Sequence, residues 1–205
     1  MTSFQLHIYI CEVELQCELS LAAAESVNKY FKGQRDRVKA GADAERVQVQ
    51  LFGSLHSFLT HAALVSRLLW PSIPRRGREK ERGTHERRHT QAANRGKQVR
   101  RALGIQNKQP SGQRTLRDHL EHFDERLDDW VLTSNRSTFI DLGVGPPNRV
   151  FGPPLDTMRW FDQTDWTFHF RGERFDLSAL VAWIKTIHGL AAHVRRHDAT
   201  IPPAA

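Results

Sequence analysis

The residues of this chain best suited to chemistry form a short run at 117–122, which holds an arginine, acidic residues and two histidines. Arg117 is followed directly by Asp118 and five positions later by His122. A guanidinium can hold a phosphate and its developing negative charge, while an imidazole can move protons near neutral pH. These two groups are a minimal set for cleaving RNA without a metal ion. Arg117, Asp118 and His122 are therefore the candidate catalytic residues.

The spacing of this run has a geometric consequence. An offset of five residues places Arg117 and His122 roughly 140° apart around one helix. A single helix does not bring both onto one phosphate, whereas a two-fold dimer could combine two such helices. The structural alternative is that these residues form ordinary surface pairs four residues apart, Arg117 with Glu121 and Asp118 with His122. Since the apolar stripe of this segment lies elsewhere, replacing Arg117 or His122 is expected to leave the fold intact. His119 lies nearer that stripe and is expected to pack.

Helical periodicity of the apolar residues predicts most of the elements that must position this run. Thr2 or Ser3 can begin the first helix, Asp43 the second, and Asp176 or Ser178 the last. A charged stretch after the first helix either extends it or forms a loop. The predicted helices cover about 2–32, 43–70, 90–103, 111–132 and 176–190.

The sequence pattern changes before the last helix, where short apolar runs alternate with glycines and prolines. Such runs predict strands, and residues 163–165 are expected to turn a hairpin. The expected fold is mainly α, an up-and-down bundle of about five helices with a small β-hairpin insertion before the last helix. We expect one domain over 1–205, a basic loop at 75–90 and a β-rich insertion at 135–175. The predicted strands cover 138–144, 148–151, 158–161 and 166–170.

The net charge of +7 is concentrated in one part of the chain. Residues 75–101 contain eleven basic and three acidic side chains, so this segment carries 11 − 3 = +8 and the remainder −1. Such a patch favours a polyanion, with RNA as the expected partner, although a solvated loop is the alternative. The predicted nucleic-acid contacts are Arg87, Arg88, Arg95, Lys97, Arg100, Arg101 and Arg114.

A competing motif lies inside the basic segment. His85, Glu86 and His89 fit H-E-x-x-H, which on a helix can place two imidazoles on one face for zinc. The neighbouring arginines would oppose a divalent cation, so we expect no metal and no cofactor. A zinc metallohydrolase stays the least favoured of three hypotheses.

The two cysteines and the hydropathy of the chain indicate in which cellular compartment the protein is expected. Cys11 and Cys17 would lie roughly 240° apart around one helix, so they are not expected to bridge. The first residues lack a basic leader, and the longest uncharged run, 47–66, carries glutamines and histidines that suit a core helix better than a membrane span. These observations predict a cytoplasmic protein that does not cross a membrane.

Arg117-Asp118-x-x-x-His122 resembles the arginine, four to six residues, histidine motif of HEPN domains, in which a polar residue commonly follows the arginine. The expected helix order is also similar to theirs, with the motif on the fourth helix. The resemblance implies a homodimeric, metal-independent endoribonuclease, often within toxin–antitoxin or anti-phage defence systems with a partner protein. Arg117 would hold the scissile phosphate, His122 would act as base or acid for attack by the 2′-hydroxyl, and Asp118 would orient one of them. Since some members are not catalytic, a silent nucleic-acid- or protein-binding module is the alternative.

Overall fold

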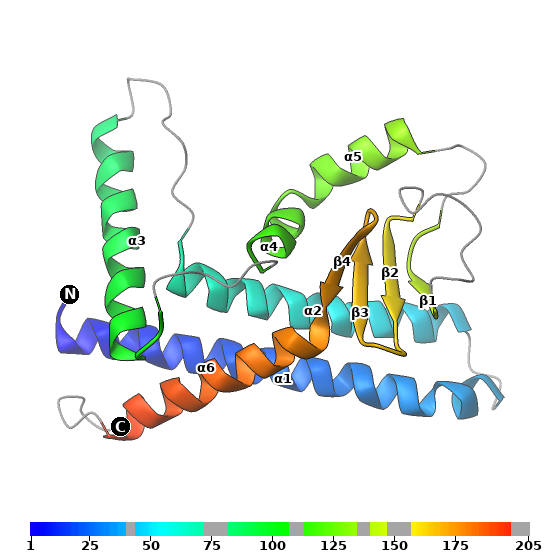
Figure 1. Cartoon of the computed structure of the whole chain (residues 1–205), viewed down its shortest axis with the longest axis horizontal. Coiled ribbons are helices and arrows are strands. Elements are labelled where there is room, and N and C mark those ends of the chain that lie inside the picture. Colours follow the sequence, from blue (N-terminus) through cyan, green and yellow to red (C-terminus); the bar gives the residue numbers. More distant parts are fainter. Residues whose placement is uncertain (40–43, 72–81, 107–112, 135–139, 147–156, 198–205) are drawn as a thin grey trace.

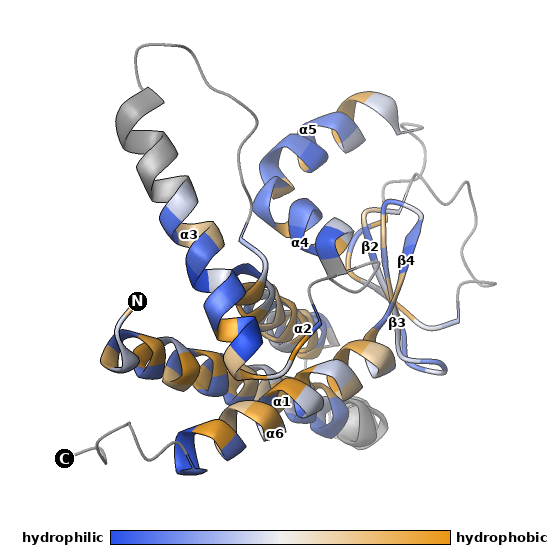
Figure 2. Cartoon of the chain, turned by 60° about the vertical axis from the view of Figure 1, so that its left-hand side comes forward, coloured by the Kyte–Doolittle hydropathy of each residue, from blue (hydrophilic) through white to orange (hydrophobic). Residues whose placement is uncertain are grey.

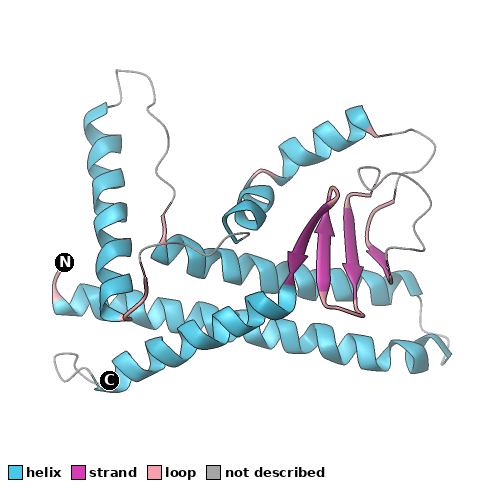
Figure 3. Ribbon diagram, viewed as in Figure 1, coloured by secondary structure: helices cyan, strands magenta, loops and turns pink. Residues whose placement is uncertain are grey.

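The computed structural model of the chain describes residues 1–39, 44–71, 82–106, 113–134, 140–146 and 157–197, with the backbone alone at 31–39, 44, 82–89 and 113. Within these residues the protein is mainly helical, with a small sheet before the last helix (Figure 1, Figure 3). This confirms the predicted mainly α class with a β-rich insertion. The helices are α1 (Ser3–Lys39), α2 (Ala44–Leu69), α3 (Arg82–Ala102), α4 (Gln113–Glu121), α5 (Phe123–Thr133) and α6 (Leu177–His197).

The helical core forms where α1 packs against α2 and α6 (Figure 1). Each of these helices repeats apolar residues every three or four positions, which produces one buried stripe per helix. Val13, Phe58 and Ile184 are fully buried, one from each helix. Ser20 is buried among them, and its hydroxyl donates to the Phe58 carbonyl at 3.1 Å. The core therefore holds this polar group with its hydrogen bond satisfied.

A small sheet lies beside the helices and shares their core. Its spatial order is β1-β2-β3-β4, with β1 parallel to β2 and the other neighbours antiparallel. Phe161, Phe168 and Phe170 join the same buried cluster as the helix residues. The strands are β1 (Gly143–Val144), β2 (Arg159–Asp162), β3 (Thr167–Phe170) and β4 (Glu173–Asp176).

The sheet agrees with the predicted strands in part. The turn between β2 and β3 covers the predicted hairpin turn at 163–165. β1 occupies only the end of the predicted strand 138–144, and 148–151 lies outside the described residues. The sequence patterns predict no strand at β4, whose four residues include one apolar side chain, Phe175. Pairing with β3 and burial of Phe175 make this segment a strand.

Local hydrogen bonds fix two of the predicted helix starts. The Gln5 amide donates to Thr2 Oγ1 at 3.2 Å, and the Thr2 amide donates to Gln5 Oε1 at 2.9 Å. This reciprocal pair is a capping box at the start of α1. Asp176 Oδ1 accepts from the Ala179 amide at 2.9 Å at the start of α6. The caps expected at Thr2 and Asp176 are confirmed, while Asp43 lies outside the described residues.

Two helices are longer than predicted. α1 continues to Lys39, so the charged stretch after residue 32 extends the helix. α3 begins at Arg82, so the segment predicted as a basic loop at 75–90, with a poorly packed helix as the alternative, is helical from residue 82 onward. Arginine and glutamine are good helix formers, and a helix whose far end is packed can extend into solvent with charged residues. Residues 72–81 lie outside the described part of the chain.

The predicted helix at 111–132 is two helices instead of one. The break is at His122, whose backbone adopts φ −116° and ψ 39° between α4 and α5. Before the break, Leu116 and Arg117 are buried where α4 contacts α2. After it, Phe123 meets the sheet, with its ring 6.1 Å from that of Phe170. α4 is held by α2 as well as by the sheet, whereas Phe123 of α5 packs on the sheet, and this difference accounts for the break without a glycine or proline.

The C-terminal end of α2 lies very close to α3. A β-carbon added at Gly96 would lie 2.7 Å from both the Leu69 carbonyl oxygen and Pro71 Cδ. On either side of this glycine, Arg95 donates to the Arg67 carbonyl at 3.3 Å and Arg100 donates to the Leu69 carbonyl. The missing side chain therefore permits the contact that orients α3.

Among the described helices, α6 has the length and apolar composition that could cross a membrane. In this fold its Leu177, Leu180, Ile184, Ile187 and Ala191 are buried, as in a core helix.

We expect Gly96→Ala to destabilise the protein by about 1–3 kcal/mol, because a methyl group would push against backbone atoms at the end of α2. The matched control is Gly189→Ala in α6, where nothing lies within 4 Å of the added β-carbon. That control should gain up to about 1 kcal/mol from helix propensity. Urea unfolding of both variants measures the difference, and equal midpoints would contradict the proposed close approach.

Candidate functional site: the 117–122 segment and the basic helix

Arg117 is a buried residue that holds α4 onto the end of α2. Its side chain is 6 % exposed. One of its terminal nitrogens donates to the Trp70 carbonyl at 3.0 Å and lies 3.5 Å from the Ser66 hydroxyl. Its Nε is 3.5 Å from the Glu121 carboxylate. Arg117 thus satisfies a carbonyl just beyond the C-terminus of α2, where cations are stabilised by the helix dipole.

The environment of Arg117 is that of an anchored structural cation. Burial lowers the pKa of its guanidinium, and the Glu121 carboxylate acts in the opposite direction. An arginine stays charged in such a site because its guanidinium is not deprotonated in proteins. The expectation that Arg117 could be removed without harm to the fold is wrong, since its side chain is buried and bonded to α2. The predicted pair between Arg117 and Glu121 is confirmed.

Asp118 and His122 are both exposed, but they do not pair with each other. Asp118 lies 3.4 Å from Arg126, and His122 Nδ1 lies 3.3 Å from the Glu125 carboxylate. The pair predicted between Asp118 and His122 assumed an unbroken helix, and the break at His122 removes that geometry. His122 is therefore an accessible imidazole beside a carboxylate, at a bend between two helices.

His119 is the buried histidine of the run. Its ring stacks on Phe170 with centroids 4.9 Å apart and meets the edge of Phe175 at 5.9 Å. Its Nε2 lies 3.1 Å from the Glu173 carboxylate on β4. This confirms the expected packing role, and it joins α4 to the sheet.

The surface that carries His122 is strongly acidic. Residues 113–133 contain six acidic and three basic side chains, so this segment carries 3 − 6 = −3. All six acids are exposed, and Figure 2 shows α4 and α5 as largely hydrophilic. Negative charge on this surface repels a phosphate backbone. The acidic residues are Asp118, Glu121, Asp124, Glu125, Asp128 and Asp129.

The basic helix α3 has the opposite charge. Residues 82–102 contain seven basic side chains and one acidic side chain, a charge of 7 − 1 = +6. In Figure 1, α3 extends away from the layer of α1, α2 and α6, with its C-terminal end against them. A positively charged helix projecting from a bundle is accessible to an extended polyanion.

The predicted nucleic-acid contacts divide into anchored and exposed residues. Arg95 and Arg100 are anchored, since both donate to α2 carbonyls and lie 5.5 Å from the ring centroids of Tyr9 and Trp70. Lys97, Arg101 and Arg114 are exposed. Arg87 and Arg88 lie on the N-terminal half of α3, where only the backbone is described.

Within the described residues, the other histidines, acids and thiols offer no second site. His85, Glu86 and His89 lie on the α3 backbone, but their side chains are outside the described part of the chain. Among the described side chains, Glu14, Glu18 and His188 come within ligand distance of one another, but Glu14 is bound by Arg195. Both cysteines are free, and burial raises the pKa of Cys17 to about 12, so its thiol stays protonated.

No family model, curated protein or solved structure matches this chain. The likeness to HEPN domains therefore rests on the residues at 117–122 and on the order of the helices.

Sequence reasoning missed the residues that define the surroundings of the run. Glu125 and Arg126 contact His122 and Asp118, and neither contact was predicted. Glu125 follows His122 by three residues, a spacing that could have indicated the pair. The burial of Arg117 depends on contact with α2, about fifty residues away, and no local pattern encodes it.

We expect Arg117→Met to destabilise the protein by about 1–3 kcal/mol, because it leaves the Trp70 carbonyl without its buried donor, while Glu121 keeps Arg67 at 3.3 Å. Arg114→Met removes an exposed arginine from the same helix and should change stability by no more than about 0.5 kcal/mol. His122→Ala should likewise change stability by no more than about 0.5 kcal/mol. Urea unfolding compares the three variants. An Arg117→Met protein as stable as the Arg114→Met protein would show that the buried contact is dispensable.

Proposed function

We propose that this protein is a cytoplasmic nucleic-acid-binding module, with RNA as its ligand, that binds through the exposed face of α3. The observation that carries this proposal is the separation of charge between two helical segments of the chain, +6 on residues 82–102 and −3 on residues 113–133. Phosphates would be attracted to α3 and repelled from α4 and α5. This proposal corresponds to the alternative of a HEPN-like module that binds nucleic acid without cleaving it.

The contacts on this surface are best assigned to Lys97 and Arg101. Both are exposed on the part of α3 whose side chains are described, and no side-chain hydrogen bond or ion pair to another described residue holds either of them. Arg95 and Arg100 instead hold the helix in place, so their loss would disturb the fold as well as the charge. The side chains of Arg87 and Arg88 are outside the described part of the chain.

We expect the combined change Lys97→Glu and Arg101→Glu to weaken binding to single-stranded RNA about tenfold or more at low salt, with stability unchanged. The slope of log affinity against log salt should become shallower by about one for each phosphate that the variant no longer binds. Fluorescence anisotropy over a salt series measures both quantities.

The matched control is Lys185→Glu, which changes an exposed lysine on α6 in the same way. It should leave affinity within about twofold of the wild type. If the α3 variant bound RNA as well as the Lys185→Glu protein, the assignment of the surface would be wrong. Duplex DNA, tested in parallel, shows whether the preference is for RNA.

A second candidate function is the metal-independent endoribonuclease, which one observation favours. His122 is exposed and lies 3.3 Å from the Glu125 carboxylate, a pair that could orient an imidazole for proton transfer to or from a 2′-hydroxyl. In this candidate Arg117 would hold the phosphate only after exchanging its bond to the Trp70 carbonyl. Asp118 and a second copy of the chain would complete the site, in a toxin or defence setting with a partner protein.

The nuclease candidate is tested by incubating the wild type and His122→Ala with RNA in excess EDTA. Cleavage by the wild type alone, with 2′,3′-cyclic phosphate ends, would support it and place His122 in the reaction. Binding without cleavage by either protein would leave the binding module as the function. His122→Ala is a clean variant for this purpose because its side chain lies in solvent.

A further inference from the structure

α1 carries an exposed apolar stripe on the side opposite its buried face. Phe4, Ile8 and Leu15 are 61 %, 50 % and 45 % exposed, and Leu19 follows at 40 %. At about 100° per residue these four positions fall within about 60° around the helix. Val13 and the other buried residues of α1 lie on the far side of the same helix. An apolar stripe of this length on a soluble helix indicates a contact surface.

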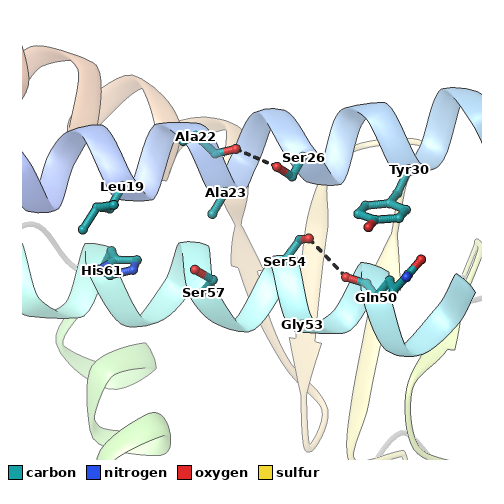
Figure 4. A pocket seen from close by; sticks show the side chains of 10 residues that line it. All are labelled: Leu19, Ala22, Ala23, Ser26, Tyr30, Gln50, Gly53, Ser54, Ser57 and His61. Atoms are coloured by element: carbon teal, nitrogen blue, oxygen red, sulfur yellow. Dashed lines mark hydrogen bonds between the residues drawn. The ribbon is translucent and has the colours of Figure 1, made fainter. Parts of the chain in front are cut away.

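The stripe leads into a groove between α1 and α2. The groove encloses a volume of about 390 Å³, and small residues line much of it, including Ala22 and Ser26 of α1 and Gly53 and Ser57 of α2 (Figure 4). Two small residues four positions apart on each helix leave room for side chains from outside. Leu19 lies at one end of the groove and Tyr30 at the other (Figure 4).

The polar residues that line the groove are uncharged, and two of the serines are already hydrogen-bonded. Among the described residues, no charged side chain lines it. The Ser26 hydroxyl donates to the Ala22 carbonyl at 3.0 Å, and the Ser54 hydroxyl donates to the Gln50 carbonyl at 3.1 Å (Figure 4). Since these hydroxyls are satisfied within their own helices, the surface they present suits apolar side chains.

Along α1, large apolar residues before Leu15 and small residues after it lie at equal distances from Leu15. Phe4 lies eleven residues before Leu15, and Ser26 lies eleven after it. Ile8 and Ala22 lie seven residues before and after. If two copies of α1 met antiparallel at Leu15, Phe4 and Ile8 of each would face the small residues and the groove of the other. A two-fold interface requires this kind of self-complementary surface.

We propose that a second copy of this chain docks antiparallel along α1, with Leu15 at the two-fold axis and Phe4 and Ile8 in the partner's groove. The surface is large enough for a stable pair. From Phe4 to Ser26, the residues that face each other in this pair, it runs about 33 Å at 1.5 Å per residue, and two adjacent helices make it about 20 Å wide. The resulting area of roughly 660 Å² per copy lies within the range of a standard interface. This contact lies on a different element from the α4–α5 segment that the nuclease candidate would pair.

Charge reversal at the axis provides the first test. In Leu15→Glu two carboxylates would face each other, and in Leu15→Lys two ammonium groups, so each variant alone should dimerise about 100-fold more weakly than the wild type. A mixture of the two should recover the dimer as a heterodimer. Val131→Glu places a charge on an exposed apolar residue of α5 and should leave the dimer intact. Sedimentation velocity from about 1 to 100 µM measures each sample.

Cross-linking tests the antiparallel register and does not depend on the stability of the charged variants. In a Cys11→Ser background, Leu15→Cys should form a disulfide-linked dimer under mild oxidation, because the two side chains meet at the axis. Mixing Phe4→Cys with Ser26→Cys should give a mixed dimer, while Phe4→Cys alone should not. Leu132→Cys, at a more exposed position on α5, is the control and should form no disulfide-linked dimer.

Three outcomes would overturn the proposal. A wild-type protein that is monomeric throughout the concentration range has no such interface. A dimer that survives both Leu15 charge variants uses another surface. A monomer that binds phosphatidylglycerol vesicles through Phe4 and Ile8, as judged by loss of binding in Ile8→Glu, would assign the stripe to a membrane surface. None of these measurements uses RNA, so they are independent of the proposed function.

Discussion

The arrangement of the helices depends on arginines that complete the C-terminal end of α2. The last carbonyls of a helix have no partner within it, and the helix dipole makes this end negative. Arg95 and Arg100 of α3 donate to the Arg67 and Leu69 carbonyls, and Arg117 of α4 donates to that of Trp70. These bonds fasten α3 and α4 to the same end of α2. The Trp70 ring, 6.3 Å from that of Trp183, adds α6 to the same junction.

This use of arginine changes how the basic character of the chain should be understood. Counting charges along the sequence treats every arginine of the segment as a contact for a polyanion. In the fold, Arg95 and Arg100 stabilise the junction, and burial lowers the pKa of the Arg100 guanidinium. The exposed charges of Lys97 and Arg101 are left on a helix whose position Arg95 and Arg100 maintain. Anchored and exposed cations thus alternate along one helix, and contacts with α1 and the end of α2 distinguish them.

The sequence predicted the elements that depend on local signals. The cap at Thr2 and the end of α2 before Pro71 follow from side-chain chemistry and from the restrictions proline imposes. The break at His122 could not be predicted in this way, since it arises where α4 packs on both α2 and the sheet and α5 follows the sheet alone. β4 likewise depends on pairing with β3. For the candidate site, the exposure of His122 followed from the helical phase, but the burial of Arg117 required the end of α2.

The proposed contact along α1 bears on how α3 would meet a polyanion. Arg95 lies over the ring of Tyr9, which is six residues from Leu15. In the antiparallel pair the two Tyr9 residues would lie about 18 Å apart along the helix axis, at 1.5 Å per residue. Two basic helices would then be anchored close together in one particle. A second contact with the same RNA becomes intramolecular in such a particle, so a modest affinity per helix can produce tight binding without sequence-specific contacts.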